Sequence, residues 1–571
     1  MKLITGIITE LFTETVKKID PEFSDWDKLF IQSASNEKFG DYQTNFAMTV
    51  AKVFRKAPRQ IAEDLIDNFP ENDVVEKLEI AGPGFINIFV DKKFISKTLA
   101  NISLEKWSFD HVNTKGDVVI DYSSPNIAKP MHAGHLRTTI IGDSIKRIMS
   151  YVGYRVIADN HLGDWGTQFG KLIIGYRNWL DKDAFAKDPI NELERIYIKF
   201  GEETEDNPQL NDEARAELGK LQNGDPENNK LWELFSDITK KECKRIYSRL
   251  GIEFDTYYGE SFYHPMMPEI VKVLEEKGIA VVDDEALVVF FDEEENLHPC
   301  IIRKKDGSFL YSTSDLATVQ FKKENYDLNK AVYVTDDRQI SHFKQVFRIS
   351  EKLGWDTNFA HVTFGIMSFN GQILSTRAGN TIKLDELLDE AQKRAYTIVN
   401  EKNPDLPEDE KRNIGRVVGI GALKYSDLSQ NRTSNIDFSW NKALSFEGNT
   451  APYLQYSYAR VCSIFRKAEK NNITIEENSE ILLETEIEKQ LAMSVIKFPE
   501  IVEKAAESYK PNLLADHIFD LAQKFSSFYN ATPILKSEDK LVQSRLKLSK
   551  TVAETIKQGL DLLGIEVVER M

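Results

Sequence analysis

The sequence has few of the residues and segments that mark several large protein classes. Its 571 residues include only three cysteines, Cys243, Cys300 and Cys462, and no two of them have CxxC spacing. This excludes a disulfide framework and a zinc site built from cysteine pairs. No apolar run approaches the roughly 18 residues of a membrane helix, and the first 20 residues lack the apolar stretch of a signal peptide. We therefore expect a cytoplasmic protein without a membrane span.

The chain also lacks an excess of positive charge. It has 73 Lys and Arg against 91 Asp and Glu, a formal net charge of −18, so it does not coat nucleic acid by bulk attraction. Local basic surfaces remain compatible with this total, because charges act over about 8–10 Å at physiological salt. With 41% hydrophobic and 29% charged residues, the composition is that of a globular protein. At about 100–200 residues per domain, it predicts three to five domains.

The first segment, residues 1–110, combines helical and strand patterns. Residues 1–20 have the apolar stripe of an amphipathic helix, and a second helix is expected around residues 45–53. The string LEIAGPGFINIFV, residues 78–90, predicts a strand, a Gly-Pro-Gly turn and a second strand. We expect an N-terminal α+β domain.

The second segment, residues 111–400, alternates strands and helices. A buried strand over residues 117–122, a helix from His132 to about residue 152 and a strand over 155–159 form a βαβ unit. Further strands of the same sheet are expected at residues 287–291, 331–335 and 361–364. The pattern predicts an α/β fold, a Rossmann-type doubly wound parallel sheet. A polar, helix-rich stretch near residues 181–244 is read as an insertion in this domain.

The third segment, residues 401–571, has no strand signal and is expected to be an all-helical C-terminal domain. Asn449 or Thr450 can cap the helix that starts near Pro452. The expected helices are residues 409–424, 452–470, 485–508, 511–529 and 539–563.

The most informative string is SSPNIAKPMHAGH, residues 123–135, which follows the first strand of the sheet. Ligands of open α/β sheets bind at the carboxyl ends of the strands. His132 and His135 are three residues apart at a helix start, so both rings can face one side. Gly134 removes a side chain between them, and the helix N-terminus offers unpaired N–H groups to an anion. This combination suits a nucleoside triphosphate whose pyrophosphate leaves.

The two histidines alone do not show whether this loop is a functional site. Two histidines near a helix start are more often surface or buried structural residues, and a metal is disfavoured because HxxH lacks the i,i+4 spacing of zinc proteases. The preceding strand and the neighbouring Lys129 favour a functional site. No Walker A or complete dinucleotide-binding glycine pattern competes with it.

HAGH resembles the HIGH signature of class I aminoacyl-tRNA synthetases, and the longer string around it resembles the arginyl-tRNA synthetases in particular. Similar strings follow in the family's order over essentially the whole chain. They include FGDYQTN (39–45), DNHLGDWGTQFGKLI (159–173), YSTSDLA (311–317), LSTRAGNTIKLDELLDEA (374–391) and FEGNTAPYLQYSYARVCSI (446–464). The resemblance implies an enzyme that activates arginine with ATP. It then transfers the arginyl group to the 2′-hydroxyl of the terminal adenosine of tRNA(Arg).

The resemblance also assigns the catalytic residues. His132 and His135 would contact the ATP phosphates and stabilise the transition state, with Gly134 beneath the adenine. The family's second motif, KMSKS, is altered here to ILSTR, residues 373–377, with Ile373 and Thr376 where its lysines would be. Ser375, Thr376 and Arg377 are still expected at the ATP. Lys129, just before the HIGH-like motif, is expected to replace the missing lysines with Arg377 as a helper, although a solvated loop arginine explains Arg377 equally well.

For arginine itself, the chemistry asks for an anionic, planar partner, because a guanidinium group presents paired donors. The resemblance assigns Tyr311, Asp315 and Gln339 to the arginine side chain and Asn126 to its α-amino end, with Asp121 adding negative charge. Without the resemblance, Tyr311 and Asp315 would be an ordinary pair at a helix start.

The tRNA is expected to contact two further regions. In the C-terminal helices, Tyr453, Tyr456 and Tyr458 interleave with Arg460, a combination that stacks unpaired bases. At least one of these tyrosines is expected to belong to the core. In the N-terminal domain, the resemblance places Asn36, Phe39 and Gln43 at the tRNA.

Two other functions remained open on the sequence: another adenylyl-forming enzyme with an HxGH site, and a non-catalytic tRNA-binding relative of a synthetase. The helical C-terminal segment argues against small nucleotidyltransferases, and the presence of both histidines argues against the regulator. We expect no tightly bound cofactor and no protein metal site, with Mg²⁺ arriving with ATP. A monomer is expected, and tRNA is expected to be needed even for arginine activation.

Overall fold

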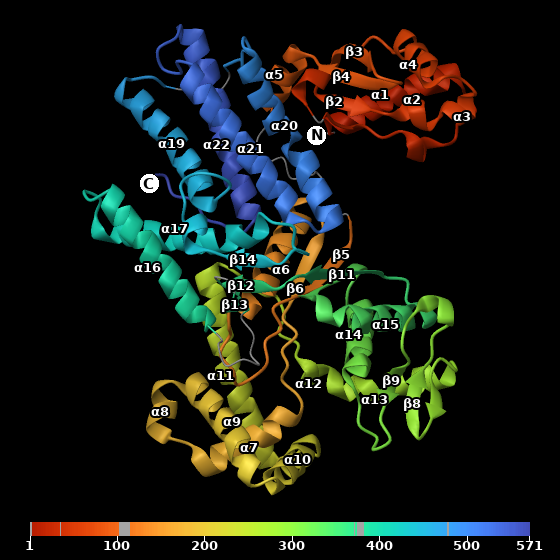
Figure 1. Cartoon of the computed structure of the whole chain (residues 1–571), viewed down its shortest axis with the longest axis vertical. Coiled ribbons are helices and arrows are strands. Elements are labelled where there is room, and N and C mark those ends of the chain that lie inside the picture. The colour runs from red at the N-terminus through yellow and green to blue at the C-terminus, as the bar shows by residue number, and fades with distance from the viewer. Residues whose placement is uncertain are drawn as a thin grey trace.

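The computed structural model describes residues 3–34, 36–101, 115–369, 372–373, 382–474, 476 and 479–571. The molecule is elongated, with a parallel sheet at its centre (Figure 1). The N-terminal unit and the C-terminal helices lie at one end of the long axis, and two groups of inserted elements lie at the other. Among the described residues, no helix has the length and apolarity needed to cross a membrane.

The N-terminal unit is the expected α+β structure. Its four-stranded antiparallel sheet has the order β1-β2-β4-β3. The strand–turn–strand prediction is confirmed, and Gly82 (φ 53°) and Gly84 (φ 148°) make the turn. The expected second helix is instead two short helices, which meet at Val50 (φ −100°, ψ 4°). The elements are α1 (Ile4–Ile19), β1 (Gln32–Ser33), β2 (Tyr42–Thr44), α2 (Phe46–Thr49), α3 (Ala51–Phe54), α4 (Pro58–Asp67), β3 (Val75–Ala81), β4 (Phe85–Val90) and α5 (Lys92–Asn101).

The central sheet confirms the Rossmann-type prediction. Its order is β11-β10-β5-β6, and all neighbouring strands are parallel. Alternate residues of β10 enter two cores: Val332 and Val334 face the core that contains α6, whereas Ala331 and Tyr333 face the core that contains α14 and α15. Helices therefore cover both faces. The elements are β5 (Asp117–Asp121), α6 (Gly134–Tyr151), β6 (Arg155–Asp159), α14 (Tyr311–Asn325), β10 (Leu328–Asp336), α15 (Ile340–Lys352) and β11 (Asn358–Phe364).

The expected strand at residues 287–291 does not belong to the parallel sheet. It is β8 (Ala286–Val289), the middle strand of a separate antiparallel sheet with β7 (Val281–Asp283) and β9 (Cys300–Arg303). Asp284 and Glu285 both have positive φ, 44° and 63°, and close a two-residue hairpin between β7 and β8. A hairpin forces antiparallel pairing with the sequence neighbour, so this prediction was wrong. The helices α12 (Glu260–Tyr263) and α13 (Met267–Glu276) precede this sheet.

The polar stretch near residues 181–244 is helical as expected. It forms a bundle with α7 at the far end of the long axis (Figure 1). Its helices and α7 are α7 (Thr167–Trp179), α8 (Lys182–Lys187), α9 (Pro189–Asp206), α10 (Gln209–Gln222) and α11 (Pro226–Leu250).

Beyond residue 400 the expected helices are present, and the Thr450 side chain caps α19 by accepting from the Tyr453 N–H. One strand was missed: β14 (Ile436–Phe438) pairs in parallel with β12 (Met367–Phe369), which also pairs with β13 (Gln372–Ile373). Three residues are too short to show an alternating pattern. The helices are α16 (Leu384–Lys402), α17 (Glu408–Leu428), α18 (Trp440–Ala443), α19 (Ala451–Lys470), α20 (Glu486–Ser508), α21 (Pro511–Ala531) and α22 (Asp539–Leu562).

A buried ion pair joins the central sheet to these helices. The guanidinium of Arg137 on α6, 2% exposed, donates to both carboxylate oxygens of Asp427 on α17 at 2.8 and 3.1 Å. Its remaining N–H groups reach backbone carbonyls, including that of Gly365 at 2.6 Å. Because removing one partner would leave a buried charge alone, at a cost of about 3–5 kcal/mol, this contact fixes how the two parts dock.

Candidate active site

Those predicted site residues of the catalytic segment that the structure describes lie at the carboxyl edge of the parallel sheet. β5, β6 and β10 end at Asp121, Asp159 and Asp336, and these strands are hydrogen-bonded neighbours. The loop after β5 leads into α6 and contains the two histidines. Tyr311 and Asp315 lie at the start of α14, which leads into β10, and Gln339 follows β10. The site therefore lies where open α/β sheets bind ligands.

The two histidines are held by backbone hydrogen bonds. The His132 N–H donates to Nδ1 of His135 at 3.1 Å, and the Gly134 N–H donates to Nδ1 of His132 at 3.1 Å. The ring centroids are 3.9 Å apart. An Nδ1 atom that accepts a hydrogen bond carries a lone pair, so each neutral ring bears its proton on Nε2. Both rings therefore offer Nε2–H donors to a ligand.

Electrostatics keep these rings uncharged. Burial and the adjacent His132 ring lower the pKa of His135 to about 3. Burial and the charge of Lys129 also lower the pKa of His132, and Glu194 opposes them. The pair is a set of neutral hydrogen-bond donors at physiological pH.

Gly134 is required by the rings themselves. A Cβ at this position would lie 2.8 Å from both Cε1 and Nδ1 of His132, closer than such atoms approach. A side chain would therefore push the His132 ring out of place. The His132 ring therefore requires a glycine at position 134 whether or not a nucleotide is bound.

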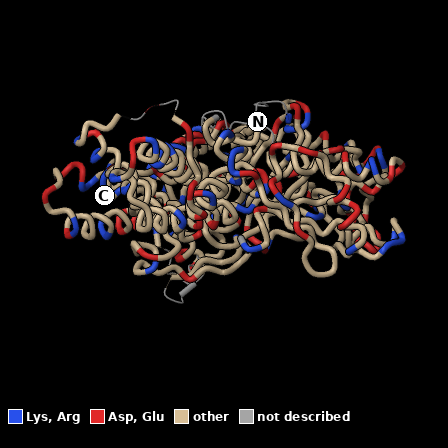
Figure 2. The backbone as a smooth tube through the Cα atoms, turned by 90° about the horizontal axis from the view of Figure 1, so that it is seen from above, with Lys and Arg blue, Asp and Glu red and all other residues tan. Residues whose placement is uncertain are grey.

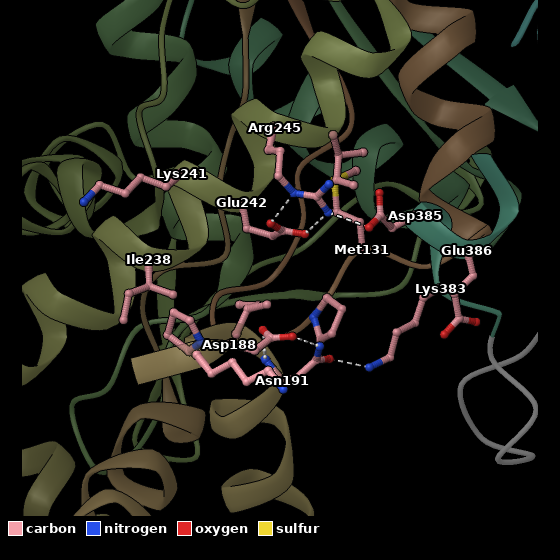
Figure 3. Close-up of a pocket in the computed structure, with 15 residues that line it drawn as sticks. Met131, Asp188, Asn191, Ile238, Lys241, Glu242, Arg245, Lys383, Asp385 and Glu386 are labelled. Atoms are coloured by element: carbon pink, nitrogen blue, oxygen red, sulfur yellow. Dashed lines mark hydrogen bonds and ion pairs between the residues drawn. The ribbon is translucent and has the colours of Figure 1, made fainter. Parts of the chain in front are cut away.

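The histidine loop is braced by the segment that precedes α16. The Ala133 N–H donates to the Ile382 carbonyl at 2.9 Å, and the Leu384 N–H donates to the Met131 carbonyl at 2.9 Å. Lys383 reaches the inserted helix α9, and a pocket of about 610 Å³ lies between α9, α11 and this segment (Figure 3). The expected ATP contacts Ser375, Thr376 and Arg377 lie outside the described residues.

Lys129 lies in the same loop, on the side that faces the insertion. The backbone before it is left-handed at Ala128 (φ 59°), whose N–H donates to the Thr239 hydroxyl of α11 at 2.9 Å. Burial lowers the pKa of Lys129, and the carboxylate of Glu194 opposes this. Its ammonium lies over the ring of Tyr197 on α9.

The predicted arginine residues Tyr311 and Asp315 lie one turn apart at the start of α14. Ser312 and Thr313 fix this start by donating their hydroxyls to the carbonyls of Ile301 and Ile302 on β9. Tyr311 is 73% exposed. Asp315 is mostly buried, and its Oδ2 pairs with Nε2 of His342 on α15. Burial lowers the pKa of His342, but the hydrogen bond and charge of Asp315 outweigh it, so the net shift is upward.

A further carboxylate, Glu260, was missed. It begins α12, where burial raises its pKa to about 7, with the charges of Asp164 and Asp315 adding to the shift and His161 opposing it. Burial raises the pKa of Tyr311, and the charge of Glu260 adds to this shift. No local pattern marks this residue in the sequence. Glu260 is 51 positions before Tyr311, and only the fold brings it near Asp315.

Asp121 is buried, and one lysine, Lys322, lies near both Asp121 and Asp159. The Nζ atom of Lys322 lies 3.9 Å from a carboxylate oxygen of Asp121 and 3.9 Å from one of Asp159. Lys322 is 1% exposed and projects from α14, seven residues after Asp315. Asp121, Asp159 and His161 form the one group among the described residues that could hold a metal ion, and Lys322 already supplies a cation there. The negative charge that Asp121 would offer to a ligand is therefore partly offset by the ammonium of Lys322.

The other two predicted arginine residues lie at the same edge of the sheet. Asn126 is exposed, and the backbone around it pairs with Gly163 after β6. A Cβ at Gly163 would lie 2.2 Å from Oδ1 of Asn126, so this glycine makes room for the amide. Gln339 is exposed and ends the single 3₁₀ turn that follows β10.

The predicted tRNA residues lie away from this edge. On α19, Tyr456 is 37% exposed, and the guanidinium of Arg460 lies over its ring at 4.9 Å. Tyr453 packs edge-on against Phe519, and Tyr458 also packs against the core. In the N-terminal unit Asn36 and Phe39 are exposed, whereas the Gln43 amide donates to Asn87 at 2.8 Å.

Comparison with known proteins decides the family. The family model described as "tRNA synthetases class I (R), catalytic domain" matches residues 98–440. Models of the "DALR anticodon binding domain" and of the "Arginyl tRNA synthetase N terminal domain" match residues 454–571 and 6–90. The chain belongs to the arginyl-tRNA synthetase family.

Individual relatives agree with this arginyl-tRNA synthetase assignment. The chain is 56% identical over 571 residues, covering 100% of both chains, to a protein of Fusobacterium nucleatum named arginine–tRNA ligase. Arginyl-tRNA synthetase structures from Plasmodium falciparum (28% identity) and Thermus thermophilus (26% identity) superpose with TM-scores of 0.85 over 100% of each chain. The family's activity, ATP-dependent attachment of arginine to tRNA(Arg), is the activity of this chain.

Proposed function

We propose that the histidine loop binds ATP and that the carboxylates at the start of α14 and α12 bind the guanidinium group of arginine. One observation carries the proposal. Both histidine Nδ1 atoms accept backbone N–H groups, which leaves two Nε2–H donors on neutral rings 3.9 Å apart. Neutral, preorganised donors stabilise negative charge as it develops on a phosphate without reorganising at the moment of reaction.

In the first step, the arginine carboxylate attacks the α-phosphorus of ATP and pyrophosphate leaves with its electron pair. His132 and His135 donate hydrogen bonds to the phosphate oxygens, and Lys129 neutralises charge on the leaving group. In the second step, the 2′-hydroxyl of the terminal adenosine attacks the arginyl carbonyl, releasing AMP. Positioning and electrostatics suffice for both steps, so no covalent enzyme intermediate is needed.

The arginine side chain carries a planar cation with paired donors. Asp315 supports its recognition because His342 engages only Oδ2, which leaves Oδ1 for the ligand. Glu260 and the exposed Tyr311 complete this end, and Gln339 adds an amide. Asp121 and Asn126 would receive the α-amino group.

The tRNA contacts are proposed on two surfaces. Tyr456 with Arg460 on α19 offers a stacking face and a cation to anticodon bases. Asn36 and Phe39 offer exposed groups on the N-terminal unit, with Gln43 nearby. Figure 2 shows Lys and Arg distributed over the whole length of the molecule among acidic residues, which supports local phosphate contacts despite the charge of −18. Affinity for tRNA should fall as salt rises.

We further propose that arginine activation requires bound tRNA, that Mg²⁺ enters with ATP, and that the protein acts as a cytoplasmic monomer. The test supplies ATP, Mg²⁺ and tRNA with each of the twenty amino acids in turn. Arginine alone should be attached to tRNA, and pyrophosphate exchange should fall to background without tRNA. Full exchange in the absence of tRNA would contradict the proposed dependence, and charging of another amino acid would contradict the site assignment.

A further inference from the structure

The inserted helix α9 contacts the active-site loop through a lysine and an aromatic ring. The Nζ atom of Lys129 lies 4.2 Å from the centroid of the Tyr197 ring. A second ammonium, that of Lys171 on α7, lies 5.9 Å from the same centroid. Tyr197 is half-buried and packs against the core of the insertion, so its ring is a fixed surface. The free lysine side chain is flexible, and this contact restricts it.

A second contact holds α9 against the same loop. Lys383 donates to the side-chain oxygen of Asn191 (Figure 3). Its Nζ atom also lies 3.1 Å from a carboxylate oxygen of Glu194. Lys383 is also the residue whose backbone pairs with His132. Asn191, Glu194 and Tyr197 are spaced three residues apart and lie on one side of α9. The helix is therefore tied to the histidine loop at two points, and the position of the Tyr197 ring relative to His132 is set by both.

We propose that Tyr197 is a positioning residue for arginine activation, because its ring holds the ammonium of Lys129 beside the histidine pair. The inference rests on the role proposed above for Lys129. A cation over an aromatic face is attracted by the negative face of the ring, and the attraction grows as the pair is removed from water. An ammonium held at one place meets the phosphates of ATP without first losing side-chain freedom. The insertion thereby contributes to ATP use through a residue that does not touch ATP.

The experiment measures tRNA-dependent pyrophosphate exchange in variants of the full chain. Tyr197→Leu removes the ring face and should lower kcat/KM for ATP about tenfold, with KM for arginine changed less than twofold. Tyr197→Phe keeps the face and should restore the activity to within twofold of the parent. Ile198→Ala removes a neighbouring, 53% exposed side chain on the same helix and should have no effect.

A series of ring-fluorinated phenylalanines at position 197 separates the electrostatic contact from packing. Fluorine weakens the negative face of the ring while nearly preserving its shape, so this series remains informative even if Tyr197→Leu fails to fold. We expect kcat/KM for ATP to fall stepwise with one, two and three fluorines. A flat series, or a folded Tyr197→Leu protein within twofold of the parent, would overturn it.

Lys129→Met distinguishes failure of this inference from failure of the proposed function. If Lys129 acts on ATP, Lys129→Met alone lowers kcat/KM for ATP, and adding Tyr197→Leu lowers it less than twofold further. An impaired Lys129→Met protein with an additive effect of Tyr197→Leu overturns the role of Tyr197 alone. A fully active Lys129→Met protein overturns the role of Lys129, and the role of Tyr197 with it.

Discussion

The two ends of the active site are built in opposite ways. The histidine end comes from one continuous loop, its own backbone N–H groups orient both rings by donating to their Nδ1 atoms, and its rings are uncharged. The arginine end is assembled from α12, α14 and α15: burial raises the pKa of Glu260 to about 7, and the Asp315 carboxylate already pairs with His342. The donors for ATP are already oriented in the absence of ATP, whereas the carboxyl groups of the arginine end gain a full partner only when a cation binds.

The largest expected effect tests the charged end. Asp315→Ala removes the carboxylate that supports guanidinium binding and should lower kcat/KM for arginine at least ~100-fold, because a desolvated cation loses its partner. Pyrophosphate exchange with tRNA present measures this, and KM for ATP should change little. Asp356→Ala, at an exposed aspartate before β11, is the control. Normal exchange by the Asp315→Ala protein would refute the assignment.

A smaller effect is expected at the preorganised end. Gly134→Ala places a Cβ 2.8 Å from the His132 ring and should lower kcat/KM for ATP about tenfold by displacing the Nε2–H donor. Gly201→Ala on α9 is a matched control because nothing lies within 4 Å of the added Cβ. If Gly134→Ala keeps parental kinetics with ATP, the His132 ring position is not needed for catalysis.

The two ends should also differ in their response to pH. Burial raises the pKa of Glu260 to about 7, so this carboxyl group is largely neutral at pH 6 and largely charged at pH 8. Its attraction for a guanidinium group therefore appears as pH rises, and KM for arginine should fall about fivefold over this range. Titration of His135 should not change KM for ATP between pH 6 and 8, because burial and the His132 ring lower the pKa of His135 to about 3.

Two variants check the source of this pH dependence. Glu260→Gln should flatten the dependence of the arginine KM, whereas His342→Gln, which keeps a hydrogen-bond donor for Asp315, should retain it. A steep profile in the Glu260→Gln protein would assign the titration to another group.

The same difference explains what could be predicted from the sequence. His132, Gly134, His135 and the strand before them are contiguous, so one short string specified both their chemistry and their place at the sheet edge. Glu260 could not be predicted, because its proximity to Asp315 depends on how α12 packs near α14 in the fold. Lys322 was missed since a lysine in a helix pattern is usually solvated, and only the fold buries it between Asp121 and Asp159.

The fold followed the same rule. The βαβ unit is local in sequence and was predicted correctly, as were the C-terminal helices. Strand partners were predicted less well: β8 was assigned to the parallel sheet although it pairs with its sequence neighbour β7, and β14 pairs with a strand almost 70 residues away. Hydrophobic periodicity identifies an element, but it does not identify its partner.

The most direct test compares arginine with citrulline, which has the same shape but a neutral urea group in place of the guanidinium. Pyrophosphate exchange is measured with ATP and tRNA present and either amino acid supplied. If carboxylates recognise the charge, kcat/KM for citrulline should be at least ~100-fold below that for arginine. Exchange with citrulline within about tenfold of arginine would contradict a pocket that works by charge.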